Sequence, residues 1–317
     1  MVKPYDIVLM FNMKDFSLQK AIVTILLILS VSALPLKATA SDRVVTDLLG
    51  RELVISDNPQ RIVALAPSVT EIVFALGQEQ RLVGVTQYSD FPKAAVQYPK
   101  VGSYVNLDLE RIFALQPDFC IGVKDGNPKD VVDRLGDLNI PVFVVNPRGL
   151  ASVMETVSAI GDILDAEERA QAVIADMQNR IDAVDQVVKQ SQTKPRVIFQ
   201  IGISPIVSVG DPTFINELIV RAGGTNVAAG SVAYPRYSRE QVLGMKPEVI
   251  VITSMARHAI FQQVKAEWEQ WPEIPAVRNG HIFMQDSNLF DRPTPRLVDG
   301  LELLSRMIHP ELFKGAQ

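Results

Sequence analysis

The chain has 317 residues, a net charge of −5 and a single cysteine. A negative net charge is a poor match to the phosphates of nucleic acid, so we expect no nucleic-acid partner. Cys120 alone can form neither an internal disulfide nor a multi-cysteine metal site, and its place in an apolar stretch predicts a buried side chain.

Residues 1–40 have the composition of an export signal. Two lysines precede the apolar run 21–34, and the small-x-small sequence Ala38-Thr39-Ala40 stands directly before Ser41. The apolar run is short for a membrane span, and no cysteine that could carry a lipid lies near it. We therefore expect cleavage between Ala40 and Ser41 and a soluble protein in the periplasm, whether the chain starts at its first residue or at Met13.

Strand and helix patterns alternate in the first half of the chain, after a short leader over residues 41–60. We expect strands at 61–65, 82–86, 119–123 and 142–145, and helices at 68–76, 108–115, 128–138 and 151–164. In the first of these helices, Ser68 and Glu71 have the spacing of a capping box. The alternation predicts a mostly parallel sheet with helices on both faces.

A long helix should follow, from residue 166 to about residue 190. Its apolar stripe consists of Val173, Met177, Ile181, Val184 and Val188. Such a helix spans roughly 38 Å at about 1.5 Å per residue, about the width of a domain. We therefore expect a signal peptide at 1–40, an α/β lobe at 41–165, a rigid linking helix at 166–192 and a second α/β lobe at 193–317.

The second half restarts the alternation. We expect strands at 196–202, 249–253 and 282–285. One helix should run from Asp211-Pro212 to Arg221, a second should begin at Ser238, a third should end near Trp271, and the last should span 295–308. The fold class is thus α/β, with two lobes of βα units joined by one long helix. Ligands of such sheets lie beyond the carboxyl ends of the strands, and clefts between domains are preferred sites.

One sequence pattern occurs in both lobes. Residues 109–118 (LERIFALQPD) and 239–248 (REQVLGMKPE) each place a glutamate seven residues before a proline, with an acidic residue and an apolar strand after it. Glu110 and Glu240 are therefore equivalent carboxylates, each in the first turn of a helix. The helix dipole alone favours an acidic residue there, but the repetition favours a shared role.

Several segments resemble the periplasmic cobalamin- and ferric-siderophore-binding proteins of ABC importers. They are IVALAPSVTEIVFALG (62–77), GVTQYSDFP (84–92), residues 107–118, residues 237–253 and RPTPRLVDGLELLSRMIHPELF (292–313). In that family, two α/β lobes are joined by one long helix. The segments YSDFP, LERIFALQPD, FQIGISP and YPRYSREQ make the cobalamin-binding branch the most similar.

The resemblance implies roles for individual residues. Glu110 and Glu240 match the glutamates that dock on the membrane permease, one in each lobe. Tyr88, Tyr104, Tyr234 and Arg292 match positions that contact a corrin in the cleft, and Ser68 begins a helix whose backbone N–H groups face the ligand. Asn288 stands where a carboxylate is usual, and this chain has fewer aromatic rings around the cleft than cobalamin binders have. The implied ligand is a corrinoid; haem and a ferric siderophore are the alternatives.

Other candidate residues have simpler explanations. Trp268 and Trp271 should pack in a lobe core, and His258, His281 and His309 lack the spacing of metal ligands, so we expect no metal site. Tyr104 would ligate a metal only if the ligand were haem.

An exported α/β enzyme is the alternative from another class, but the chain has none of the common nucleotide-binding or hydrolase motifs. We expect a monomer without enzymatic activity or a resident cofactor. Its partners would be a metal chelate, an ABC permease and the ATPase of that permease.

Overall fold

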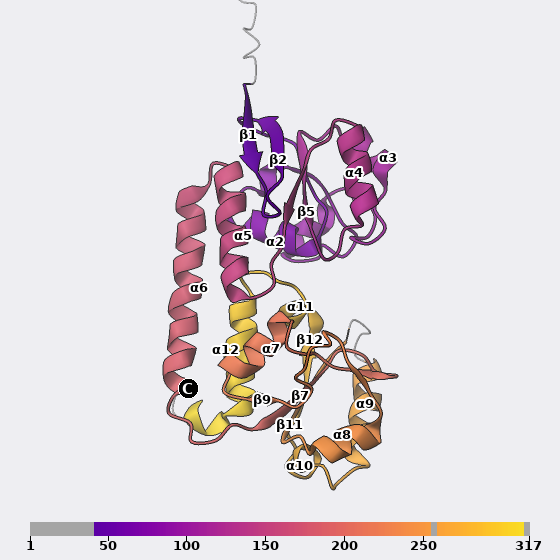
Figure 1. The fold of residues 1–317 in the computed structure, drawn as a ribbon, viewed down its shortest axis with the longest axis vertical. Coiled ribbons are helices and arrows are strands. Elements are labelled where there is room, and N and C mark those ends of the chain that lie inside the picture. Colours follow the sequence, from indigo (N-terminus) through magenta and orange to yellow (C-terminus); the bar gives the residue numbers. More distant parts are fainter. Residues whose placement is uncertain (1–40, 255–258, 314–317) are drawn as a thin grey trace, which may run out of the picture. The chain divides into compact units, whose positions relative to one another are not determined.

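The computed structural model describes residues 41–254 and 259–313 (Figure 1). The expected signal segment and His258 lie outside these ranges. Residues Asp42–Gln317 form one compact unit, which contains two four-stranded sheets and two small antiparallel pairs of strands. Within the described ranges, none of the helices combines the length and the apolar character that a membrane span requires.

The first large sheet has the strand order β4-β3-β5-β6 and is entirely parallel. Its strands are β3 (Ile62–Ala64), β4 (Leu82–Val85), β5 (Phe119–Val123) and β6 (Val142–Val145). Helices α2 (Pro67–Ala75) and α5 (Leu150–Ile163) pack on one face, and α3 (Leu109–Ala114) and α4 (Lys129–Asp137) on the other. Cys120 is fully buried under α3 and α4, as its sequence context predicted.

The second large sheet, with strand order β12-β11-β7-β9, is also parallel throughout. Its strands are β7 (Arg196–Gln200), β9 (Thr225–Asn226), β11 (Val249–Ser254) and β12 (Ile282–Asp286). Helices α7 (Phe214–Arg221) and α12 (Leu297–Ile308) cover one face; α8 (Arg239–Met245), α9 (Ala259–Glu269) and α10 (Pro275–Arg278) lie on the other. Trp268 is 2% exposed in that second core and donates from Nε1 to Gln200 Oε1 at 3.0 Å. The expected α/β architecture is therefore confirmed.

The long helix α6 (Glu167–Val188) packs antiparallel to α5, and together they connect the two sheets (Figure 1). Leu150 and Val153, at the start of α5, belong to the core of the second sheet, whereas Val157 and Ile160 belong to the core of the first. The backbone N–H of Leu150 donates to Glu217 Oε2 of α7 at 2.9 Å. The chain thus passes between the lobes through α6, and the packing of α5 beside it stiffens the connection.

Arginine 180 also fixes the long helix to the second half of the chain. Its guanidinium lies 2.8 Å from Glu302 Oε1 and 2.5 Å from Asp299 Oδ1, both on α12. The hydrogen bond from Arg180 lowers the pKa of Glu302, so that its carboxylate remains charged in the pair. A charged pair of this kind sets the register of α12 along α6.

Three local expectations were wrong. Residues 41–60 are not a featureless leader, because β1 (Asp42–Thr46) and β2 (Glu52–Ser56) form an antiparallel hairpin. Helix α2 begins at Pro67 with Ala66 as its N-cap, so Ser68 lies inside the first turn and makes no capping box. Helix α7 is capped by the hydroxyl of Thr213, which accepts from Asn216 N at 3.2 Å, and not by Asp211. In α2, Pro67 at the first helical position favours the helix start that Ser68 was expected to provide.

The repeated helices α3 and α8 begin and end alike. Asp108 and Ser238 cap them by accepting from the backbone N–H three residues later. Gln116 and Lys246, which hold the same place in the two repeats, both have positive φ, 47° and 49°, and each is followed by a proline. The internal repeat therefore extends to backbone geometry.

Candidate ligand-binding site

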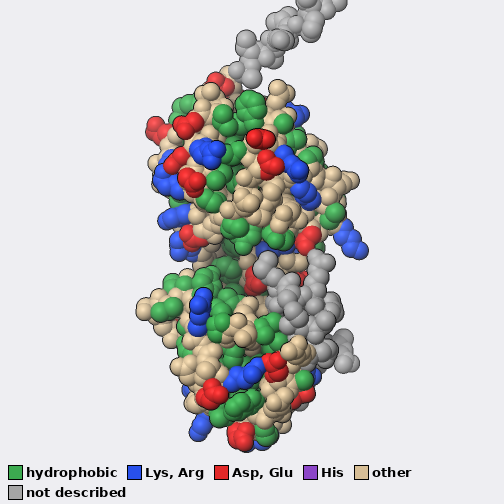
Figure 2. All heavy atoms as spheres, turned by 90° about the vertical axis from the view of Figure 1, so that its right-hand side faces the viewer, with side chains coloured by type: hydrophobic (Ala, Val, Ile, Leu, Met, Phe, Trp, Pro, Cys, Tyr) green, Lys and Arg blue, Asp and Glu red, His purple; other side chains and the backbone are tan. Residues whose placement is uncertain are grey.

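A cavity of about 420 Å³ lies beyond the carboxyl ends of the strands of both sheets. Its wall is made of Ala66, Pro67, Ser68, Tyr88, Tyr104, Val123, Asp125, Asn146, Pro147, Arg148, Ile201, Pro212, Thr213, Phe214, Ile215, Tyr234, Ser287, Asn288, Asp291, Arg292 and Pro293. In the space-filling view, the surface is hollowed at mid-height, where green side chains gather at the margin (Figure 2). The volume is within the range of small-molecule sites, roughly 300–1,000 Å³.

All six residues expected to bind ligand border this one cavity. They are Ser68, Tyr88, Tyr104, Tyr234, Asn288 and Arg292. The two glutamates of the repeat lie elsewhere: Glu110 and Glu240 are exposed, in the first turns of α3 and α8. The chain thus separates the two groups of residues, one in a cavity and one on the outer surface.

Three tyrosines from segments far apart in the chain provide the aromatic part of the wall. Tyr88 and Tyr104 come from loops of the first half, with ring centroids 6.5 Å apart in an edge-to-face arrangement. Tyr88 and Tyr234 are 42% and 54% exposed, which leaves their rings available for contact. Burial, and then the nearby Asp125, raises the pKa of Tyr234, so its phenol stays protonated and can donate a hydrogen bond.

Asn127 fixes the loop that carries Tyr104. Its side-chain amide donates to the carbonyl oxygens of Tyr104 and Leu65, each at 2.8 Å, and its Oδ1 accepts from Val123 N at 2.7 Å. Asn127 is only 7% exposed, so these bonds are shielded from water. The Tyr104 backbone is therefore held against the ends of β3 and β5.

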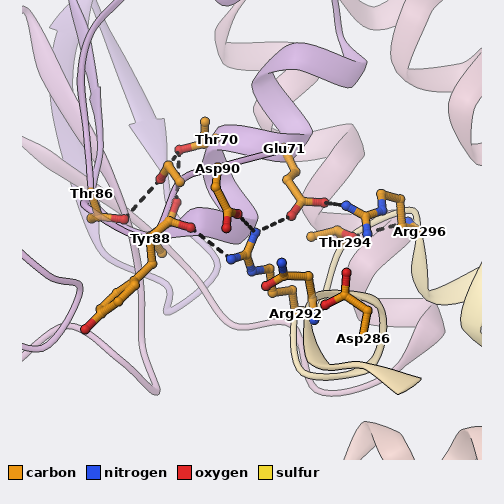
Figure 3. Close-up of polar contacts among 12 residues, drawn as sticks. Thr70, Glu71, Thr86, Tyr88, Asp90, Asp286, Arg292, Thr294 and Arg296 are labelled. Atoms are coloured by element: carbon orange, nitrogen blue, oxygen red, sulfur yellow. Dashed lines mark hydrogen bonds and ion pairs between the residues drawn. The ribbon is translucent and has the colours of Figure 1, made fainter. Parts of the chain in front are cut away.

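Arg292 reaches from the loop after α11 (Ser287–Phe290) to the first half of the chain (Figure 3). It donates from Nη1 to Glu71 Oε1 at 3.0 Å and to Asp90 Oδ1 at 2.9 Å, and from Nη2 to the carbonyl of Tyr88 at 2.9 Å. Arg292 was expected to contact a ligand. The partners it has belong instead to the opposite lobe.

Asp291 is a carboxylate that the sequence interpretation overlooked. Its Oδ1 accepts from the hydroxyl of Thr253 at 3.4 Å, and its side chain faces the cavity. The surrounding protein raises the pKa of Asp291 to about 7, mainly by desolvation, although the group keeps access to the water in the cavity. The carboxylate that is usual in cobalamin binders was expected at position 288, where this chain has an asparagine. The sequence signal that could have identified Asp291 is its place as an acidic residue directly before Arg292.

Other wall residues also had no role in the sequence interpretation. Arg148 pairs with Asp125 at 2.7 Å, both following strands of the first sheet. Phe214, at the start of α7, adds a fourth aromatic ring. Both could have been anticipated from the rule that ligands bind beyond the carboxyl ends of parallel strands.

Metal-ligating side chains do not gather in the described part of the chain, where no group of three or more His, Cys, Asp or Glu residues is placed to hold an ion. His309 is buried at the end of α12, with Nδ1 3.1 Å from Ser191 Oγ and 3.1 Å from Glu311 Oε1. His281 stacks on Phe283. These contacts give both histidines a structural role.

Comparison with known proteins identifies the family. The sequence model of the family described as "Periplasmic binding protein" matches residues 62–289. A vitamin B12-binding protein of Vibrio parahaemolyticus is 32% identical over 252 residues, which cover 78% of this chain and 90% of that protein. This chain belongs to the periplasmic binding protein family.

Solved structures of two kinds of binding protein share the fold. A periplasmic vitamin B12-binding protein of Vibrio cholerae has a TM-score of 0.71 and 29% identity, covering 80% of this chain and 97% of that one. A periplasmic haem-binding protein of Pseudomonas aeruginosa has a TM-score of 0.73 and 30% identity, covering 80% and 93%. The chain is thus a periplasmic binding protein of the ABC importer type.

Proposed function

We propose that the protein captures a corrinoid of the cobalamin type in the cavity between its lobes and delivers it to the permease and ATPase of an ABC importer. The observation that carries the proposal is the wall of the cavity, where aromatic rings from both lobes surround groups able to hydrogen-bond with amides. Tyr88, Tyr104 and Tyr234 offer flat apolar surface, and each aromatic ring can bury roughly 150–250 Å². Asn288 and Asp291 offer polar atoms to the amide side chains of a corrin.

The relatives support this choice of ligand. The family member of V. parahaemolyticus and the solved structure from V. cholerae are both named as vitamin B12-binding proteins. The experiment is mass spectrometry of the ligand that co-purifies with the native protein. Unmodified corrinoid at one equivalent is the expected result, and it would also argue against catalysis on the ligand.

Haem is the second candidate, because Tyr104 lies in the cavity wall and a phenolate can ligate haem iron. The similarity to the P. aeruginosa haem-binding protein, at 30% identity, supports this alternative. Haem binding with a phenolate-type absorption spectrum, lost in Tyr104→Phe, would assign the protein to haem transport. Tight binding of a ferric siderophore without corrinoid binding would assign it to siderophore uptake.

The location we propose is the periplasm, after removal of residues 1–40. The small-x-small sequence before Ser41 supports this cleavage site. N-terminal sequencing of the native protein should begin at Ser41, in the periplasmic fraction. A protein that retains residue 20, or that is recovered as a lipidated membrane form, would contradict the proposal.

A further inference from the structure

Arg292, the least exposed cation in the wall of the cavity, is already neutralised by carboxylates. The side chain of Arg292 is only 12% exposed, and its Nη1 lies 3.0 Å from a carboxylate oxygen of Glu71 and 2.9 Å from one of Asp90. Figure 3 shows the guanidinium between these two carboxylates, with the carbonyl of Tyr88 on its other side and the Tyr88 ring pointing away. The N–H groups of Arg292 that make these hydrogen bonds therefore point away from a ligand.

A second arginine extends the same cluster. Arg296 Nη1 lies 3.5 Å from the other oxygen of Glu71, and its guanidinium lies 3.7 Å from the centroid of the Phe91 ring. The side chain of Glu71 is only 3% exposed, so the attraction is weakly screened by water. Two arginines from the second half of the chain thus meet two carboxylates from the first half, and their charges cancel.

The remaining charged groups of the described wall do not restore a positive field. Arg148 pairs with Asp125 at 2.7 Å, and both side chains are more than half exposed, so water screens that pair. Asp291 adds a carboxylate that accepts a hydrogen bond from the hydroxyl of Thr253. Among the described lining residues, the cations are therefore matched and one acidic group is left over.

We propose that Glu71 and Asp90 determine ligand specificity: by holding Arg292, they withdraw its positive charge from the cavity, which then favours ligands bearing amides over chelates bearing carboxylates. This inference rests on the proposed capture of a bulky chelate in this cavity. The physical reason is that a carboxylate moved from water into the cavity needs a free cation or donors to replace its hydration. An amide needs only hydrogen-bond partners, which Tyr234, Asn288 and the carboxylate of Asp291 supply.

The test is the double variant Glu71→Gln, Asp90→Asn, which keeps the side-chain shapes and removes both negative charges. Affinities are measured for two pairs of ligands that differ only in carboxylates: cobalamin against its monocarboxylic acid, and haem against its dimethyl ester. We expect the variant to bind the carboxylate member about tenfold better relative to its neutral partner, or about 1.4 kcal/mol. Asp133→Asn, which removes an exposed carboxylate paired with Lys129 on α4, is the control and should leave both ratios unchanged.

The outcomes separate this inference from the proposed function. Unchanged ratios in a variant that still binds either ring would overturn the inference and leave the proposed function intact. A native chain that binds neither ring would overturn both. Should the double variant not fold, Asp90→Asn alone, at a 40% exposed carboxylate, must shift the ratios in the same direction by a smaller factor.

Discussion

Arg61 and Arg196 make the same contacts in two different lobes. Arg61 stands directly before β3 and Arg196 is the first residue of β7. The backbone N–H of each donates to the acidic residue after the repeated proline, Asp118 at 2.8 Å or Glu248 at 2.9 Å. The guanidinium of Arg61 reaches the carbonyls of Leu115 and Gln116, and that of Arg196 reaches the carbonyl of Met245. The acidic residue and the arginine therefore tie the end of the repeated helix to its sheet.

This arrangement predicts a modest contribution of each arginine to stability. Arg61→Ala should lower the free energy of unfolding by about 1 kcal/mol, because two helix-end carbonyls lose a charged donor at an exposed site. Urea denaturation measures the change. The control is Arg134→Ala on the exposed side of α4, which should stay within about 0.5 kcal/mol. A loss no larger than that of the control would mean that the contact has no stabilising effect.

The same fixed helices carry the proposed docking carboxylates. Reversing both charges, with Glu110→Lys and Glu240→Lys, should abolish uptake, since like charges across an interface repel by several kcal/mol. Ligand affinity should stay within about twofold, because both sites lie outside the cavity. Each single variant should give a partial defect in a transport assay.

Asp130→Lys is the matched control, since Asp130 is also an exposed acidic residue in the first turn of a helix. It should transport normally. Normal uptake by the double variant, or loss of its ligand binding, would refute the docking role.

The tyrosines of the cavity should contribute directly to affinity. Tyr104→Ala and Tyr234→Ala are each expected to weaken corrinoid binding by ~1–3 kcal/mol, the scale of an aromatic contact at a binding hot spot. Fluorescence or calorimetric titration measures the change. Phe113→Ala removes a ring that is 57% exposed on α3, outside the cavity, and should leave affinity unaltered. Equal effects of all three substitutions would point to general destabilisation instead.

Asp291 should make stability depend on pH. Its pKa is raised from 3.8 to about 7 in the folded protein, so between these values the folded state binds more protons than the unfolded state. The folded state therefore loses stability as pH rises towards 7, and the loss is absent below about pH 4. Asp291→Asn imitates the protonated group, so it should raise Tm at pH 8 and leave Tm unchanged near pH 4. A difference in Tm that is the same at both pH values would contradict this assignment.

The sequence predicted the architecture better than it predicted the partners of single side chains. Periodicity was sufficient for the parallel sheets and for α6, because regular elements reflect the local pattern of apolar residues. The capping box at Ser68 was wrong because the helix begins one residue earlier, at Pro67, and the side chain of Glu71 pairs with Arg292, 221 residues away in the chain. Pairing between such distant residues leaves no local pattern.

Some of the site residues were predicted from the sequence and others were missed. The six cavity residues came from the family resemblance, and Asp291 was missed because the desolvation of its carboxyl depends on the packing around β11 and α11. The hairpin at the start of the unit was missed because its strands have apolar residues on both faces: Val44 and Val54 are 66% and 58% exposed, whereas Ile55 is buried in the core. The sequence therefore shows no apolar–polar alternation there.

Titration calorimetry of the purified protein with cobalamin, cobinamide, haem and a ferric hydroxamate tests the central claim most directly. We predict that cobalamin or cobinamide binds with a Kd of micromolar or tighter, about −8 kcal/mol or more favourable. Haem should bind more weakly because it bears carboxylates, and the ferric hydroxamate because it offers no flat ring to the tyrosines of the cavity. No measurable corrinoid binding together with tight binding of haem or of the ferric chelate would contradict the account.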